Sequence, residues 1–461
     1  MKLYDTLSGE KQEFTPLGDQ VAIYVCGPNL YGPCHIGHAL SYVFFDVLRR
    51  YLEYQGHRVH HVQNFTDIED RIIEVAQRGG TSIGELANHY IERFLHEIDE
   101  LGVQRAHDYP RATEYIDRMI EIIQDLIAKN NAYVVDGDVY FRVRNFKDYG
   151  HLSRRPIEDM RAGSRIEIDP RKEDPMDFAL WKSSKEGEPA WPTPWGLGRP
   201  GWHIECTAMS MSLLGNQIDI HGGGQDVIFP HHENEIAQSE VYTGDSPFVR
   251  FWVHNGLLRL PDDDSEKMTR HTGNFISCRD ALDAHSADTL RMYFFSSHYR
   301  SPLMYTEEGI SSASRALERL LNALRSNTDE DDDEGQLNVE TYHNRFIASM
   351  DDDLNTPQAL AAMFDLAHEI NRQKETGTAV GGAQRALREM ASVLGLSMNE
   401  QSGSDHKDAY PFICLLVETR TQLRAERNFQ MGDSIRNQLE ELGVILEDSA
   451  DGTKWRFKGL G

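Results

Sequence analysis

Two histidines stand where a predicted strand leads into a predicted helix. The segment His35-Ile-Gly-His38 follows the apolar run Val21–Cys26 after a Gly/Pro-rich turn and precedes the amphipathic segment Ala39–Gln55. A helix N-terminus offers unpaired backbone N–H groups and the positive end of the helix dipole, and both favour phosphate. Because four such residues recur by chance, the segment predicts a phosphate site only together with other residues.

A basic segment far downstream, Lys267-Met-Thr-Arg-His271, supplies such residues. Lys267 offers a point charge and Arg270 a planar fork, so the two could close over a triphosphate from the opposite side. This pair of signatures resembles that of class I aminoacyl-tRNA synthetases, whose second signature is a Lys-Met-Ser-Lys-Ser loop. Arg270 keeps a charge of that loop, so we expect a working pyrophosphate clamp with altered kinetics. The acidic run Asp262–Asp264 just before it is expected to be a solvated insertion.

Four residues carry side chains that bind zinc. Cys26 ends the first predicted strand and Cys206 follows Gly201-Trp-His-Ile-Glu. On a helix, His231 and Glu235 would share one face, which suits two ligands of one zinc ion. The alternative is that the cysteines are small buried hydrophobes and the His/Glu pair a surface interaction. A zinc protease is disfavoured because neither His-Glu-x-x-His nor His-x-x-Glu-His occurs here.

Together these segments resemble the cysteinyl-tRNA synthetase family along the whole chain. Further matching stretches are Asn64–Asp70, Pro110–Thr113, His221-Gly-Gly-Gly-Gln-Asp226, Met350–Pro357 and Leu446–Trp455. The resemblance implies an enzyme that activates L-cysteine with ATP to cysteinyl-adenylate and transfers it to the 3′ end of cysteine tRNA. It implies His35 and His38 on the phosphate side and Lys267 and Arg270 in the clamp. The remaining residues that it places at ATP are Gly27, Asn29, Gly37, Gly223 and Asp226.

The glycine-rich segment 221–226 has two interpretations. In the first, its small residues allow close approach of the backbone to a nucleotide, and Asp226 accepts hydrogen bonds from ribose hydroxyls. The alternative is an ordinary turn in which Asp226 caps the next helix.

Zinc would let the site discriminate cysteine from serine, which fits any pocket that cysteine fits. Zinc binds thiolate at neutral pH and lowers its pKa, while an alcohol competes poorly, so ligation can replace editing. The resemblance implies one zinc per subunit on Cys26, Cys206 and His231 with Glu235 as the fourth ligand. It also implies magnesium with ATP, and Trp202 in the cysteine pocket.

The expected fold class is α/β: a class I synthetase Rossmann-like parallel sheet with an inserted domain, then a helical domain and a small C-terminal α/β anticodon module. Strands Val21–Cys26 and Arg58–Phe65 with a helix between them predict a βαβ unit, and Gln217–His221 a further strand. We expect the nucleotide-binding fold over residues 1–112 and 201–255, an insertion over 113–200, a loop-bearing stem-contact region over 256–325, a helical tRNA-binding domain over 326–401 and the anticodon module over 405–461. Residues 133–143 are expected to be strand-like and 402–408 a linker.

Three charged residues of the terminal module are expected near the anticodon: Arg424, Asp433 and Asp448. Arginine offers a fork to guanine and carboxylates accept from base amino groups, while Trp455 could stack on a base. The alternative is that these charges are only solvated.

Composition places the chain among globular proteins of the cytoplasm. Hydrophobic residues make up 39% and charged residues 26%, and no apolar run is long enough for a bilayer. Five cysteines spread over 461 residues argue against a disulfide framework. The family resemblance implies a monomer.

The formal charge of −27 disagrees with a polyanionic partner unless basic residues gather locally. The chain has 12 Lys against 35 Arg, and a second acidic run occupies 329–334. We therefore hypothesise that the protein works in concentrated salt, where dense carboxylates are screened.

Two other functions share some of these features. A zinc-dependent cysteine ligase of the mycothiol type has the same adenylating fold but lacks the anticodon module. An inactive RNA-binding paralogue would explain the altered 267–271 loop, although the zinc-binding residues and both histidines argue against it.

Overall fold

The structure is a computed structural model in which the chain forms two compact units, Met1–Met398 and Asn399–Gly461. It describes residues 1–156, 169–261, 275–325, 337–399, 405–425, 428–442, 444–449 and 452–457. None of the helices in these ranges combines the length and the apolar composition that crossing a membrane requires.

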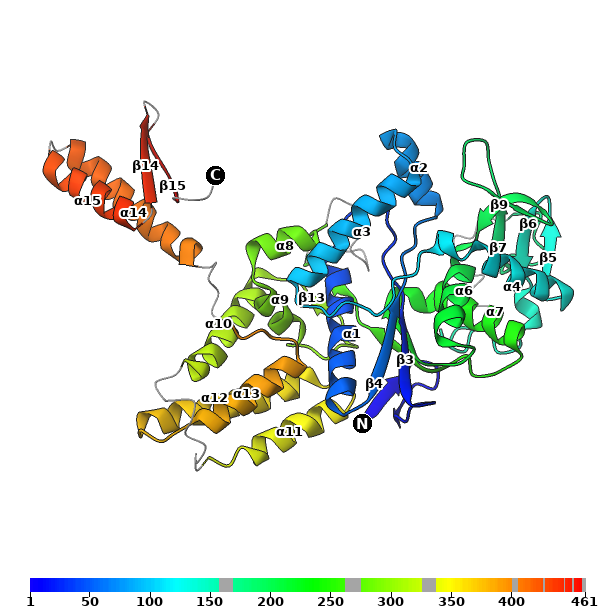
Figure 1. Ribbon diagram of the computed structural model, residues 1–461, viewed down its shortest axis with the longest axis horizontal. Helices are drawn as coiled ribbons and strands as arrows, with labels where there is room; N and C mark the ends of the chain where they lie inside the picture. Colours follow the sequence, from blue (N-terminus) through cyan, green and yellow to red (C-terminus); the bar gives the residue numbers. More distant parts are fainter. Residues whose placement is uncertain are drawn as a thin grey trace. The chain divides into compact units, whose positions relative to one another are not determined.

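A four-stranded parallel sheet forms the centre of the first unit (Figure 1). The strand order is β11 (Val249–Asn255), β10 (Ile218–Gly224), β3 (Gln20–Val25) and β4 (Arg58–Gln63). In register, Ile23 of β3 lies between His61 of β4 and Ile220 of β10. The predicted α/β fold class is confirmed, and the three strands predicted from the sequence lie within two residues of the expected starts.

Helix α1 (Ile36–Tyr54) connects β3 to β4 and completes the βαβ unit. Its residues Val43, Leu48 and Leu52 are fully buried, as the helical spacing of apolar residues predicts. Helices α2 (Asp70–Gly79) and α3 (Ile83–Glu100) follow β4, and α6 (Trp202–Leu214) and α7 (Glu233–Thr243) flank β10 in the sequence. The apolar side chains of the unit form two large clusters.

The inserted segment begins with α4 (Ile116–Ala128) and forms an antiparallel sheet. Its strand order is β5 (Ala132–Val135), β6 (Asp138–Phe141), β7 (Phe178–Ser183), β9 (Gly196–Pro200) and β8 (Trp191–Thr193). The residues 133–143 expected to be strand-like form most of β5 and β6, and Asp136 and Gly137, with φ of 51° and 87°, turn the chain between the two strands. Asp-Gly is the pair that a two-residue hairpin turn with positive φ favours.

Helices dominate the rest of the first unit, where α11, α12 and α13 pack together beyond α10 (Figure 1). Their bounds, with those of α8 and α9, are Cys278–Ala284 (α8), Ala287–Phe294 (α9), Glu307–Leu324 (α10), Glu340–Asp351 (α11), Thr356–Glu375 (α12) and Gly381–Val393 (α13). Short strands complete the unit: β1 (Lys2–Asp5), β2 (Glu10–Glu13), β12 (Leu258–Arg259) and β13 (Leu303–Met304).

The second unit consists of α14 (Asp405–Ala425), α15 (Phe429–Glu441), and an antiparallel pair, β14 (Val444–Ser449) and β15 (Gly452–Phe457). The linker expected over 402–408 is wrong in its second half, because α14 already begins at Asp405. Residues 405–408 contain no glycine or proline, and an aspartate is favourable in the first turn of a helix.

Candidate active site

A cavity of 430 Å³ opens at the carboxyl ends of β3, β10 and β11. In a sheet of this kind, ligands bind outside the carboxyl ends of the strands, where the strand order reverses. The walls include most of the residues that the sequence singled out: Cys26, Gly27, Asn29, His35, Gly37, His38, Trp202, Cys206, Gly223, Asp226 and His231.

His35 and His38 form the cap of α1. The Nδ1 atom of His35 accepts from the backbone N–H of His38, and Nδ1 of His38 accepts from that of His35, both at 3.2 Å. The two rings stack with centroids 3.6 Å apart. Because Nδ1 is the acceptor in each ring, the proton of a neutral ring is on Nε2, which makes Nε2–H the donor that can serve a phosphate.

Two glycines of the cavity wall lie so close to neighbouring atoms that a larger residue would not fit without a shift of those atoms. A Cβ on Gly37 would lie 3.0 Å from Nδ1 of His35, so a larger residue would disturb the stacked histidines. A Cβ on Gly27 would lie 1.5 Å from the carbonyl oxygen of Asn64, whose side-chain oxygen also accepts from the Gly27 N–H at 2.9 Å. Gly27 therefore lets the chain after β3 approach the chain after β4.

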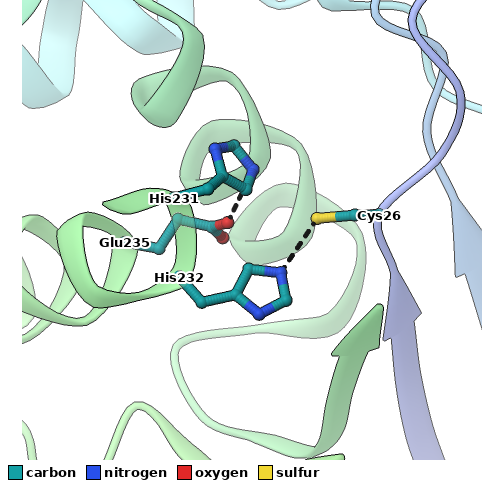
Figure 2. Close-up of side chains that lie close together, drawn as sticks. All are labelled: Cys26, His231, His232 and Glu235. Carbon is teal, nitrogen blue, oxygen red and sulfur yellow. Dashed lines mark hydrogen bonds and ion pairs between the residues drawn. The ribbon is translucent and has the colours of Figure 1, made fainter. Parts of the chain in front are cut away.

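A cluster of possible metal ligands occupies one end of the cavity. The ligand atoms of Cys26, His231, His232 and Glu235 all lie within 4.8 Å of one another (Figure 2). Cys206 Sγ lies 3.9 Å from Cys26 Sγ, so the structure brings together all four residues predicted to bind zinc. His232, whose Nε2 is 3.2 Å from Cys26 Sγ, was missed.

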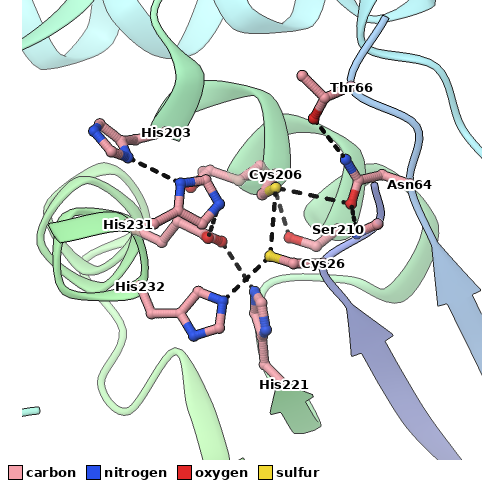
Figure 3. A network of polar contacts seen from close by, with 12 residues as sticks. Cys26, Asn64, Thr66, His203, Cys206, Ser210, His221, His231 and His232 are labelled. Carbon is pink, nitrogen blue, oxygen red and sulfur yellow. Dashed lines mark hydrogen bonds and ion pairs between the residues drawn. The ribbon is translucent and has the colours of Figure 1, made fainter. Parts of the chain in front are cut away.

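The histidine doublet lies where a π-type turn meets α7. Residues Ile228–His232 form that turn, and both histidines of the doublet face the cluster (Figure 3). The i,i+4 pairing that the sequence predicts is present, since His231 Nε2 lies 3.0 Å from Glu235 Oε1.

The charges of the cluster depend on one another. Burial acts to raise the pKa of Glu235, but the imidazoles of His221 and His231 lower it to about 2. Burial acts to lower the pKa of His231, but Glu235 and Cys206 raise it to about 10. The hydrogen bond with Cys26 lowers the pKa of Cys206 to about 6, whereas burial raises that of Cys26 well above its ordinary value.

These donors fit a zinc ion. Two cysteine sulfurs, an imidazole and a carboxylate match the ligands that zinc takes in proteins. Oε1 of the fully buried Glu235 has no well-aligned hydrogen bond among the described residues, although His231 lies beside it. A buried carboxylate oxygen without a good partner is costly, and a cation at the cluster would satisfy it.

Further histidines contact the side chains of the cluster and hold them in orientation (Figure 3). His221 Nε2 lies 3.0 Å from Glu235 Oε2, and His203 Nδ1 lies 3.0 Å from His231 Nδ1. His232 Nδ1 lies 2.7 Å from His254 Nε2. Burial lowers the pKa of His254 to about 3, so this ring is neutral at physiological pH. The sequence offered no sign that these scattered histidines meet.

Trp202 and Cys206 stand one turn apart on α6 and both line the cavity. The indole of Trp202 stacks on the ring of His231 with centroids 4.1 Å apart. An aromatic wall beside the sulfur atoms suits a small amino acid whose side chain points at the cluster.

Comparison with known proteins decides the family. Residues 13–315 match the model of the tRNA synthetases class I (C) catalytic domain, and residues 345–399 match the DALR domain. A cysteine–tRNA ligase from Dehalococcoides mccartyi is 50% identical over 460 residues, which cover 99% of this chain and 100% of that protein.

The chain belongs to the cysteine–tRNA ligase family. A member from Halorhodospira halophila is 48% identical over 464 residues, covering 99% of each chain. A methionyl-tRNA synthetase from Mycobacterium tuberculosis, solved with methionyl-adenylate, superimposes with a TM-score of 0.60 at 14% identity and covers 82% of this chain and 89% of that chain. At that identity the likeness concerns the fold alone. The predicted family and enzyme class are confirmed.

Several residues expected to serve a cysteine–tRNA ligase either fall outside the described residues or belong to the second unit. Lys267, Arg270 and the acidic run 262–264 fall outside the described residues, as does the side chain of Asp448. Arg424 and Asp433 pair with each other in the second unit, 3.1 Å apart. Trp455 is half-buried against the small apolar cluster of that unit. The expected contacts of Lys267 and Arg270 with pyrophosphate stay predictions, as do those of the second unit with tRNA.

Proposed function

We propose that this aminoacyl-tRNA synthetase forms cysteinyl-adenylate in the cavity between the histidine cap of α1 and the cysteine cluster. The observation that carries the proposal is that one cavity is lined by His35 and His38 and also by Cys26 and Cys206. A carboxylate oxygen of cysteine attacks the α-phosphorus of ATP, and pyrophosphate leaves. A terminal hydroxyl of cysteine tRNA then attacks the carbonyl carbon, loses its proton, and AMP leaves.

The protein's part in the first step is positioning and charge stabilisation. Nε2–H of His35 and His38 donates to phosphate oxygens as negative charge develops there. Gly27, Gly37 and Gly223 let the backbone approach the nucleotide, Asn29 contacts it from the same wall, and Asp226 accepts from ribose hydroxyls. Lys267 and Arg270 bind the leaving pyrophosphate, with magnesium accompanying ATP.

The cluster selects the substrate. Cys26, Cys206, His231 and Glu235 would hold one zinc ion, which when bound accepts a thiolate and lowers its pKa, whereas the hydroxyl of serine is a poor match. His232 hydrogen-bonds Cys26 and keeps that sulfur oriented, while Trp202 packs against the substrate. We further propose that the second unit contacts the anticodon through Arg424, Asp433 and Asp448, and that the enzyme acts as a cytoplasmic monomer.

The test combines charging with metal analysis. Purified protein is incubated with labelled cysteine, bulk tRNA, ATP and magnesium, and its zinc content is measured by elemental analysis. We expect label on tRNA and one zinc per chain. Cysteine-dependent pyrophosphate exchange without charging would support a ligase of another acceptor, and charging by a zinc-free protein would remove the selection mechanism.

A further inference from the structure

The turn between α11 and α12 reaches into the catalytic part of the first unit. Asp353 lies at its centre, fully buried, with a positive φ of 62°. Its carboxylate accepts three hydrogen bonds at 2.8 Å, from the backbone N–H of Tyr4, the hydroxyl of Tyr299 and Nε of Arg300. A buried carboxylate with this many donors holds all of its partners in place.

The partners of Asp353 lie directly behind the cavity wall. The backbone N–H of Gly256, which lines the cavity, donates to the carbonyl oxygen of Tyr299 at 2.7 Å. A Cβ on Gly256 would lie 2.3 Å from the carbonyl oxygen of Ser301, so the two backbones are in contact. The Tyr299 ring also stacks on Phe44 of α1, with centroids 4.1 Å apart.

The segment after α9 that carries Arg300 also contacts the glycine-rich segment. The side-chain amide of Gln225 donates to the carbonyl oxygen of Arg300 at 3.1 Å. Gln225 is exposed and immediately precedes Asp226, which lines the cavity. The Arg300 side chain is fixed by Asp353, and its backbone in turn anchors the segment that carries Asp226.

We propose that Asp353 is a positioning residue for ATP, acting through Arg300 on the Gly224–Asp226 segment. The inference rests on the proposed placement of the ATP ribose beside Asp226. Helices α11 and α12 supply none of the described residues that line the cavity, yet their turn determines where Arg300 presents its carbonyl oxygen. The DALR part of the chain, residues 345–399, thereby contributes to nucleotide binding.

The test is cysteine-dependent ATP–pyrophosphate exchange without tRNA, in the full-length protein. Asp353→Asn, Arg300→Met and Gln225→Ala are each expected to raise the KM for ATP about fivefold while the KM for cysteine stays unchanged. The double variant Asp353→Asn/Gln225→Ala is expected to equal the larger single effect, because both changes break one path. Arg300→Lys, which keeps the charge, is expected to recover most of the loss.

A matched control lies at the same turn. Lys11→Met removes the exposed ion pair with Asp352, 2.7 Å long, and is expected to leave the KM for ATP unchanged. Gln225→Ala keeps the test decisive if Asp353→Asn does not fold, since Gln225 is exposed.

Two results would overturn the proposal, and they differ. If Asp226→Ala leaves the KM for ATP unchanged, the placement of the ribose is wrong and the inference is lost with it. If Asp226→Ala raises that KM but Gln225→Ala does not, or if the Asp353 and Gln225 effects multiply, ATP is correctly placed and Asp353 serves folding alone.

Discussion

Arg291 of α9 and Asp46 of α1 form a fully buried ion pair, with Nη2 and Oδ2 2.5 Å apart. Arg291 also donates to the carbonyl oxygens of Leu101 and Leu394, and Asp46 accepts a second ion pair from Arg50. The guanidinium of Arg291 therefore connects α1, which begins at the histidine cap, to the residues that directly follow α3 and α13.

Removing Arg291 should destabilise the first unit strongly. Arg291→Met leaves Asp46 buried with only Arg50 as a charged partner, and breaking a buried pair in this way costs about 3–5 kcal/mol. Arg50→Met is the control, because Arg50 is partly exposed and Asp46 keeps its fully buried partner Arg291, so this loss should cost less than the loss of Arg291. Urea unfolding followed by tryptophan fluorescence measures both. Equal effects of the two variants would contradict the central place given to Arg291.

The Arg291–Asp46 ion pair also predicts how the stability of the fold depends on pH. Burial acts to raise the pKa of Asp46, but Arg291 and Arg50 lower it below its ordinary value of 3.8. A carboxyl with a lowered folded-state pKa stabilises the fold above its unfolded-state pKa, and this contribution is lost as pH falls through the folded-state value. The advantage of the native protein over Asp46→Asn should therefore be full near neutral pH and shrink only below about pH 4. If the difference in unfolding free energy between the native protein and Asp46→Asn instead declined between pH 8 and 6, the assignment of this pH dependence to Asp46 would be wrong.

The buried ion pair also shows where prediction from the sequence stops. Apolar periodicity located α1 and the strands around it, because burial of one face leaves a local pattern. Arg291 and Asp46 are far apart in the sequence, and nothing local distinguishes them from solvated charges. The histidines behind the cluster are the same case, since His203, His221 and His254 come from three different elements.

Local errors had local causes. The strand-like residues 133–143 were expected without the Asp136-Gly137 turn that divides them, a signal that was present in the sequence. His232 was not named from the sequence, where the i,i+4 spacing of a helix linked only His231 with Glu235. By contrast, Cys26, Cys206, His231 and Glu235 could be proposed as one ligand set from the sequence, because thiol, imidazole and carboxylate groups all bind zinc, although no spacing rule connects the two cysteines.

Replacing one sulfur of the cluster should weaken both metal binding and substrate choice. Cys206→Ser keeps the size of the side chain but removes a group whose pKa of about 6 favours thiolate. Zinc affinity should fall by at least about 100-fold, and the preference for cysteine over serine in pyrophosphate exchange should fall with it. Cys414→Ser, in the second unit, is the matched control. Unchanged zinc content in Cys206→Ser would remove this residue from the ligand set.

Two substitutions of His38 should separate its role as a helix cap from its proposed role as a hydrogen-bond donor to phosphate. His38→Asn can still accept from the backbone N–H of His35 but lacks a donor at the Nε2 position, whereas His38→Ala loses both. Both variants should lower kcat for adenylate formation by about 10²–10³-fold with little change in the KM for cysteine. Only His38→Ala should also lower the melting temperature. A His38→Asn enzyme with normal kcat would show that the ring serves the helix alone.

Salt should act in opposite directions on the two steps of the reaction. With 74 acidic against 47 basic residues, the compact state gains from screening, and the Debye length falls from about 10 Å at 0.1 M to about 3 Å at 1 M salt. Adenylate formation without tRNA should therefore be faster in about 1 M KCl than in dilute buffer. The KM for tRNA should rise over the same range, because salt weakens contacts with phosphates. Measuring pyrophosphate exchange and charging across one KCl series separates the two effects. If adenylate formation peaks in dilute buffer and declines toward molar KCl, the acidic surface is no adaptation to concentrated salt.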